Sequence, residues 1–101
     1  MASLSSIGSS GLQAAQLRLD ASANNVANAN TPGYRRLSVA QQAVADSAGV
    51  RATVEREANE KGVALEQEAV EQMSATYAFK ASLQTIKTQD QTLGSLLDVK
   101  A

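Results

Sequence analysis

The sequence predicts a mainly α-helical protein in which two long antiparallel helices form a helical hairpin or coiled coil, with a short insert between them. Apolar residues recur at steps of three and four near both ends of the 101-residue chain. Between residues 31 and 62 this pattern breaks, beginning at the chain's one proline. Each helix has an apolar stripe to bury, and packing the stripes together is the simplest solution. We expect a discontinuous helical domain of residues 1–36 and 63–101, with residues 37–62 as the insert.

The first helix is predicted over residues 3–28. Its stripe consists of Leu4, Ile7, Leu12, Ala15, Leu19 and Val26. Gly8, Gly11 and the serines before Gln13 weaken its first turns, because glycine and serine favour non-helical conformations. We therefore expect the chain before about Ser9 to fray when the protein is alone.

Four asparagines and a turn signal end this helix. Asparagine side chains compete with the backbone for hydrogen bonds, so Asn24, Asn25, Asn28 and Asn30 indicate a helix end. Thr31-Pro32-Gly33 predicts a turn, since proline presets φ at the second turn position and glycine accepts a positive φ at the third. We expect the four amides to hydrogen-bond neighbouring backbone at the end of this helix and to face neighbouring copies of the chain, where an unpaired buried amide would cost about 1–3 kcal/mol in a wrong register.

The insert permits two interpretations. The stretches RRLSVAQQAV and VRATVERE alternate partly between apolar and polar residues, with Asp46-Ser47-Ala48-Gly49 between them, which favours a β-hairpin. The segment from Ala40 to Ala45 could equally be helical. Asn59-Glu60-Lys61-Gly62 makes a second break before the last helix.

The last helix, predicted over residues 63–99, has the strongest helical pattern. At ~1.5 Å per residue it would form a rod roughly 50 Å long. Its stripe is either core or an interface between chains, and the residues that we expect to pack are Met73, Phe79, Leu83, Ile86, Leu93 and Leu97. Aromatic residues make up only 3% of the chain. Large side chains bury the most apolar area, so this shortage favours a homo-oligomer.

Composition excludes several function classes. The chain has no histidine and no cysteine, and its serines have no motif that would place a base beside them. We expect no enzyme, no catalytic site, no cofactor and no metal site. The net charge of −1, spread along the chain, gives no footprint for nucleic acid. We find neither a cleaved signal peptide nor the ~20 apolar residues of a membrane span.

Two motifs carry a family resemblance. The first motif resembles the NNVANANTPGY signature of the bacterial flagellar rod, hook and hook-associated axial family, and consists of Asn24, Asn25, Val26, Ala27, Asn28, Ala29, Asn30, Thr31, Pro32, Gly33 and Tyr34. The second resembles the ending of rod proteins and includes Lys87, Asp90, Leu93, Gly94, Leu96, Leu97 and Asp98. The resemblance around these two motifs covers roughly residues 4–36 and 68–101, about two-thirds of the chain. Rod and hook members usually carry a longer insertion than residues 37–62, so the chain resembles a minimal rod-type subunit.

The resemblance implies a structural subunit of the basal-body rod in the periplasm. It implies passage through the flagellar export apparatus without a cleaved signal peptide, then assembly with itself and with other rod or axial subunits through packed terminal helices. A coiled-coil chaperone or adaptor that binds a partner helix is the alternative. That alternative gives no reason for NNVANANTPGY.

Overall fold

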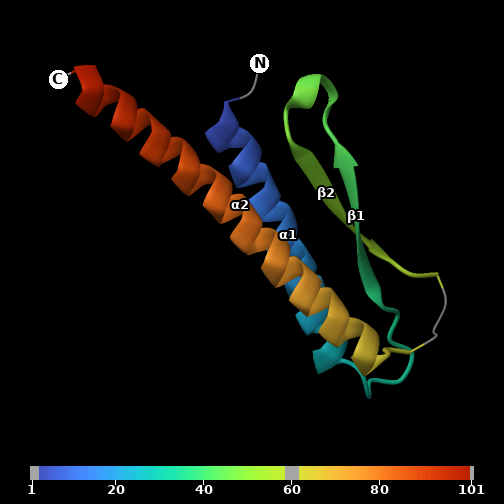
Figure 1. The fold of residues 1–101 in the computed structure, drawn as a ribbon. Coiled ribbons are helices and arrows are strands. Elements are labelled where there is room, and N and C mark those ends of the chain that lie inside the picture. The colour runs from blue at the N-terminus through green and yellow to red at the C-terminus, as the bar shows by residue number, and fades with distance from the viewer. Residues whose placement is uncertain (1–2, 59–61, 101) are drawn as a thin grey trace.

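The computed structural model describes residues 3–58 and 62–100, in five elements. Helix α1 spans Leu4–Ala27, strand β1 Leu37–Ala43, the 3-10 turn η1 Ala45–Ser47, strand β2 Val50–Arg56 and helix α2 Leu65–Lys100. The predicted fold class is confirmed: two long antiparallel helices with a small β-hairpin between them in sequence (Figure 1). The outermost residues of the predicted domain, 1–2 and 101, lie outside the described part.

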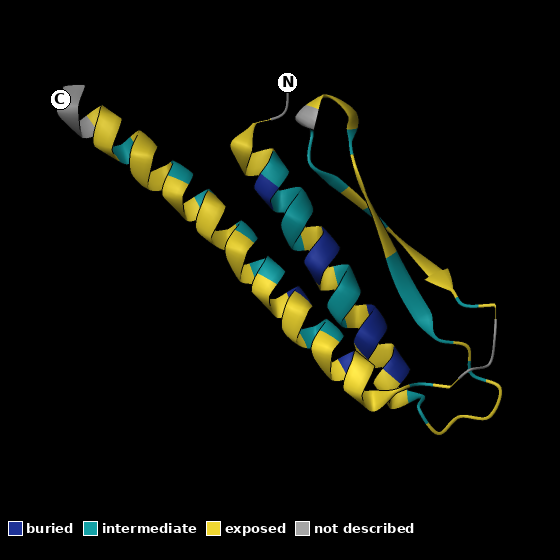
Figure 2. Ribbon diagram, turned by 45° about the vertical axis from the view of Figure 1, so that its right-hand side comes forward, coloured by how far each residue is buried: buried dark blue, intermediate teal, exposed yellow. Residues whose placement is uncertain are grey.

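Helix α1 lies in the middle of the molecule. It packs against α2 on one side and against both strands of the hairpin on the other (Figures 1 and 2). The molecule is long and thin, with extents of 64 × 25 × 14 Å. Such a shape has little interior, and what is buried lies mainly on α1 (Figure 2).

The first turns of α1 are helical from Leu4, which differs from the expected fraying before Ser9. Ser3 supplies the reason at the start, because its hydroxyl accepts a hydrogen bond from the Ser6 backbone N–H at 3.0 Å. Gly8 supplies another, since it lets α2 approach closely. A Cβ added at Gly8 would lie 2.7 Å from Ile86 Cγ1. The expected weakness is therefore offset by a cap and by packing.

The apolar core is built almost entirely of alanine. The buried hydrophobic residues are Ala14, Ala15, Ala21 and Ala75. Alanine buries little area, so the hydrophobic stabilisation of this single chain is small. Small side chains also bring the two helix axes together, which is why polar groups on facing helices reach one another directly.

The insert is a β-hairpin. β1 and β2 pair antiparallel from Leu37↔Arg56 to Ala43↔Val50, and Val44 N–H donates to the Gly49 carbonyl oxygen (2.9 Å) at the tip. The alternative of a helix from Ala40 to Ala45 is wrong, because Ala40–Ala43 pair with β2, whose valines and threonine favour strands. Only Ala45 of that segment lies in a helical turn, the short η1.

The predicted turn after the asparagines is present. Tyr34 N–H donates to the Thr31 carbonyl oxygen at 3.3 Å, and Gly33 has φ of 73°. A positive φ at the third position is the type II turn that Pro32-Gly33 favours. Of the second predicted break, residues 59–61 lie outside the described part, and Gly62 has φ of 80°.

The face of α2 that meets α1 is not the large apolar stripe. Glu68 and Ala75 are buried on this face. Met73, Leu83, Leu93 and Leu97 are exposed in the single chain, whereas Phe79 and Ile86 are half-buried at the edges of the contact. The interpretation of the four exposed residues as internal core is therefore not met, and an interface between chains is the interpretation that stays open.

Candidate functional site

The asparagine motif folds into a buried polar junction at the end of α1. Asn25 is fully buried, and its Oδ1 accepts from the Leu37 backbone N–H at 2.8 Å while its Nδ2 donates to the Leu37 carbonyl oxygen at 2.9 Å. The side-chain amide thus pairs with the first residue of β1 as a neighbouring strand would. Asn25 Nδ2 also lies 3.1 Å from Glu68 Oε1, so one amide joins α1, β1 and α2.

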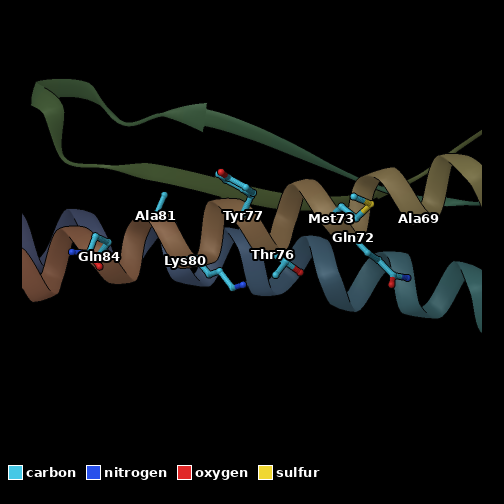
Figure 3. Close-up of a pocket in the computed structure, with 8 residues that line it drawn as sticks. All are labelled: Ala69, Gln72, Met73, Thr76, Tyr77, Lys80, Ala81 and Gln84. Carbon is cyan, nitrogen blue, oxygen red and sulfur yellow. The ribbon is translucent and has the colours of Figure 1, made fainter.

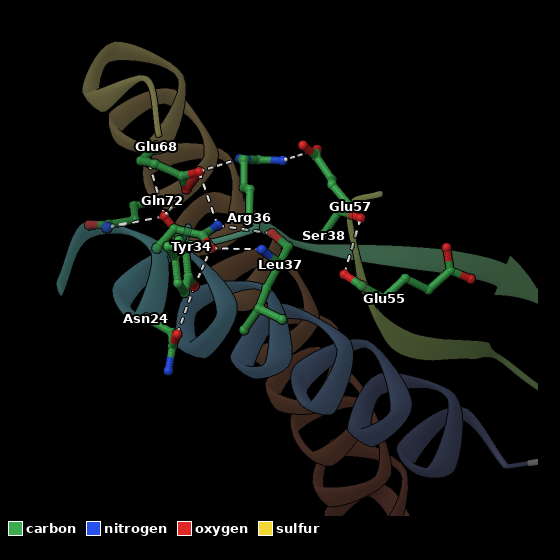
Figure 4. Close-up of polar contacts among 11 residues, drawn as sticks. Asn24, Tyr34, Arg36, Leu37, Ser38, Glu55, Glu57, Glu68 and Gln72 are labelled. Atoms are coloured by element: carbon green, nitrogen blue, oxygen red, sulfur yellow. Dashed lines mark hydrogen bonds and ion pairs between the residues drawn. The ribbon is translucent and has the colours of Figure 1, made fainter. Parts of the chain in front are cut away.

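Glu68 is the centre of this junction and is also fully buried. Its Oε2 accepts from the Ser22 hydroxyl at 2.8 Å, and its Oε1 accepts from Arg36 Nε (Figure 4). Gln72 Nε2 in turn donates to the Ser22 hydroxyl at 3.2 Å. A buried carboxylate persists only when its charge and lone pairs are matched, and here every described buried side-chain polar atom has a partner.

Arg36 connects the junction to the base of the hairpin. Its guanidinium pairs with Glu68 through Nε and with Glu57 through Nη1, the second at 3.1 Å (Figure 4). Burial lowers the pKa of Arg36, but hydrogen bonds and charge attraction from Glu68 and then Glu57 outweigh it and raise that pKa overall. Arg36 therefore stays positive and fixes β1 and the segment after β2 to α2.

Tyr34 lies against the same end of α1. Its hydroxyl is 2.7 Å from Asn24 Oδ1 and 2.8 Å from Asn25 Oδ1, and the guanidinium of Arg56 lies 5.5 Å from the centre of its ring. Asn24 is exposed and Asn25 is buried, so the ring covers the edge of the junction (Figure 4). Arg56 at the end of β2 thus makes a cation–π contact with the ring.

The other motif residues complete the helix end. Asn28 is the C-cap of α1, and its Nδ2 donates to the Asn24 carbonyl oxygen at 2.9 Å. The Thr31 hydroxyl donates to Asn28 Oδ1 at 3.2 Å. Val26, Ala27, Asn30, Pro32 and Gly33 are exposed. Three of the four amides thus bond within the chain. Asn25 is buried there, so it does not face a neighbour as expected, and for the other three that expectation stays a prediction.

Sequence reasoning missed Ser22, Arg36 and Glu68. The signal that could have found Glu68 is its place in the series Glu68, Ala75, Ser82 and Gln89, seven residues apart. A seven-residue repeat keeps side chains on one face of a helix, whether they are large or small. The search for large apolar residues passed over this face.

A second feature is the outer face of α2. Eight residues line an open depression there: Ala69, Gln72, Met73, Thr76, Tyr77, Lys80, Ala81 and Gln84 (Figure 3). All come from one helix, so the described residues give the depression no second wall. Met73 is 72% exposed and Tyr77 80% exposed. Large apolar side chains at such exposure make this face a candidate interface with another chain.

The described residues hold no group of three or more acidic side chains placed to bind a metal ion. None of the helices within residues 3–58 and 62–100 has an apolar stretch sufficient to cross a membrane. The polar groups of the junction bond to one another and hold α1, α2 and the hairpin in fixed positions.

Comparison with known families matches residues 6–35 to the family described as "Flagella basal body rod protein". The match runs through α1 and the whole NNVANANTPGY segment, so the resemblance to the flagellar rod family is confirmed over these residues. It supports a structural, rod-type role at the flagellar basal body. A search of curated proteins found no matching entry. The resemblance of the last residues of α2 to the rod-protein ending stays a prediction.

Proposed function

We propose that this chain, whose residues 6–35 match the flagellar rod family, is a structural subunit of the bacterial flagellar basal-body rod. The single observation that carries the proposal is this match, which covers the motif that builds the polar junction. The junction fixes α1, α2 and the hairpin as one unit through Asn25 and Glu68. A building block of a rod needs such fixed geometry and no reacting groups, so we assign no enzymatic activity.

Assembly runs through the two terminal helices, residues 1–36 and 63–101, while the hairpin of residues 37–62 forms an outer feature. Exposure of Met73, Leu83, Leu93 and Leu97 supports this, because the described residues leave 41% to 72% of each of them open to solvent. A contact between unlike surfaces that does not close on itself gives a helical filament. Partners are further copies of this chain and other rod or axial subunits.

Export precedes assembly in this proposal. The family resemblance suggests passage through the flagellar export apparatus without a cleaved signal peptide, to the periplasmic part of the rod. The alanine core is compatible with such a route, because a chain with little buried apolar area is easily kept unfolded. Its helices then gain their remaining cover from neighbouring subunits.

A coiled-coil chaperone or adaptor is the second candidate. The open depression on α2 favours it, since a partner helix could supply the missing wall (Figure 3). Basal bodies isolated from cells distinguish the two roles. A rod subunit remains in the purified structure, whereas a chaperone stays with the soluble fraction.

Deletion of the gene, followed by complementation, tests the proposal. We expect deletion to abolish flagella and motility, and the unaltered gene to restore both. Leu83→Asp should fail to restore them, because assembly would bury an unpaired charge. Thr85→Asp is the matched control, since it adds the same charge to α2 at an exposed position. A motile deletion strain would reject a required rod role, and full rescue by Leu83→Asp would reject the packing surface.

A further inference from the structure

The end of α2 extends beyond the start of α1. The Ser5 hydroxyl donates to Gln89 Oε1 at 2.8 Å, which links the first turn of α1 to α2. Beyond this contact α2 continues alone (Figure 1). We call residues 90–97 the overhang. Leu93, Leu96 and Leu97 are 50%, 59% and 69% exposed, and their spacing of three and four places them on one helix face.

The two helices also form an apolar groove that no described part of the chain fills. Gln16 and Leu19 of α1 line one wall, and the other wall is lined by α2 residues Thr76, Phe79, Lys80 and Leu83. The groove has a volume of about 330 Å³ and is open to solvent. Such a space is too small for a whole helix, but it accepts a few apolar side chains from a helix that lies along it.

The overhang and the groove match in spacing and charge. Phe79 and Leu83 are one helical turn apart, as are Leu93 and Leu97, so the leucines of one helix can lie between the side chains of the other. Lys80 lines the groove, and the acidic Asp90 precedes Leu93 by one turn. Apolar side chains meet apolar walls, and the charges beside them have opposite signs.

The overhang cannot fill the groove of its own chain. Both lie on one continuous helix, and about 14 residues between their centres correspond to roughly 21 Å of helix. A second copy must therefore supply the occupant. In a parallel arrangement each copy is displaced by about the same ~21 Å along the helix axis, which leaves a free overhang at one end and a free groove at the other.

We infer that the overhang of one copy docks into the Leu19–Phe79–Leu83 groove of the next copy, parallel and head to tail. This inference rests on the proposed rod function for its direction, because an antiparallel pair would satisfy both surfaces in a closed dimer. Each added copy recreates the same free surfaces. A row of these chains would therefore grow by docking the overhang of each copy into the groove of the next.

Disulfide cross-linking tests the contact, because the natural chain has no cysteine. Leu19→Cys and Leu93→Cys are placed in separate full-length chains, which are then mixed and oxidised. Docking holds the two thiols together, so we expect about tenfold more cross-linked dimer in the mixture than in either variant alone. Leu93→Cys mixed with Thr53→Cys, at an exposed position of β2, is the control pair.

The double variant Leu19→Cys/Leu93→Cys tests the direction. A head-to-tail contact gives a ladder of cross-linked oligomers. Products that stop at the dimer would overturn the parallel arrangement, and a mixed yield no higher than that of the control pair would overturn the docking itself. Failure of the rod proposal is seen separately, as motility of the deletion strain. If the unaltered gene restores motility but the cysteine variants give no specific cross-link, only this contact is refuted and the rod proposal stands.

Discussion

Asn25 takes the place of a strand partner. Its amide offers one acceptor and one donor to the backbone of Leu37, and a second donor contact reaches Glu68. Few side chains could do this, because a carboxylate lacks the donor and a hydroxyl cannot span both backbone groups. The identity of this one residue therefore joins the end of α1 to the start of the hairpin.

Asn25→Asp is expected to lower the free energy of unfolding by about 3–5 kcal/mol. The new carboxylate would lose both donor contacts and place a second negative charge beside buried Glu68. Asn30→Asp makes the same chemical change at an exposed position and should stay within about 0.5 kcal/mol of the natural chain. Urea unfolding followed by circular dichroism measures both. Equal effects of the two substitutions would show that the junction does not stabilise the fold.

Arg36 keeps the positive charge of its ion pairs at every pH below the usual pKa of arginine. Its raised pKa means that the contribution of its charge is fully present below the pKa of an unfolded arginine, and is lost only as pH rises through the higher folded value. Mild alkali should therefore leave the link between Arg36, Glu68 and Glu57 unaffected by arginine titration.

The contact between α1 and α2 is built mainly from small and polar residues, with Phe79 and Ile86 at its edges. On α1 it follows alternating steps of three and four along Gly8, Gly11, Ala15, Arg18, Ser22 and Asn25. On α2 the half-buried or buried positions repeat as Glu68, Gln72, Ala75, Phe79, Ser82, Ile86 and Gln89. Arg18 adds an ion pair to Glu71 at 2.7 Å across the two helices. Close approach of the backbones and matched polar groups replace the large apolar core of most helix pairs.

Alanine substitution at two glycines tests this close approach. Gly8→Ala should lower the thermal midpoint, because its Cβ would lie 2.7 Å from Ile86 Cγ1, an overpacking that costs about 1–3 kcal/mol. Gly94→Ala should raise the midpoint slightly, since nothing lies within 4 Å of that site and alanine favours a helix by about 0.5–1 kcal/mol. If Gly8→Ala stabilises as much as Gly94→Ala, the helices are not in close contact at Gly8.

The sequence predicted the elements well and their faces poorly. Helix periodicity and the Thr31-Pro32-Gly33 turn are local signals, and each led to an observed element. The homo-oligomer expected from the shortage of large side chains stays a prediction. The face between the helices could not be found by looking for large apolar residues, because close packing there needs small ones. Glu68 and Arg36 are 32 residues apart, and no local pattern shows that two such charges will meet.

The whole molecule is elongated, and α1 is the helix that other elements cover on two sides. α1 has neighbours on two sides, while α2 has its outer face and its overhang exposed to solvent (Figure 2). With an alanine core, the single chain gains little from hydrophobic burial, and the assembly proposed above would supply the remainder. The proposed function therefore couples stability to assembly at this scale.

Helicity of the purified chain should rise with its concentration. We expect dilute protein to be less helical than concentrated protein, because each association event covers apolar side chains such as Met73 and Leu97. Circular dichroism at increasing concentration measures the helicity, and sedimentation at the same concentrations gives the oligomeric state. A compact, highly helical monomer in dilute solution would contradict this coupling.

The two hydrogen bonds between Asn25 and Leu37 also fix the position of β1 relative to α1. Side chains alternate between the two faces of a strand, so a shift of β1 by one residue would turn every outward side chain toward α1. Because the strand register is fixed at the base of the hairpin, the tip between Ala43 and Val50 is not needed to fix it. Extra residues could be accommodated at that tip without disturbing the helical pair, which makes it the natural position for an outer domain to grow from this scaffold.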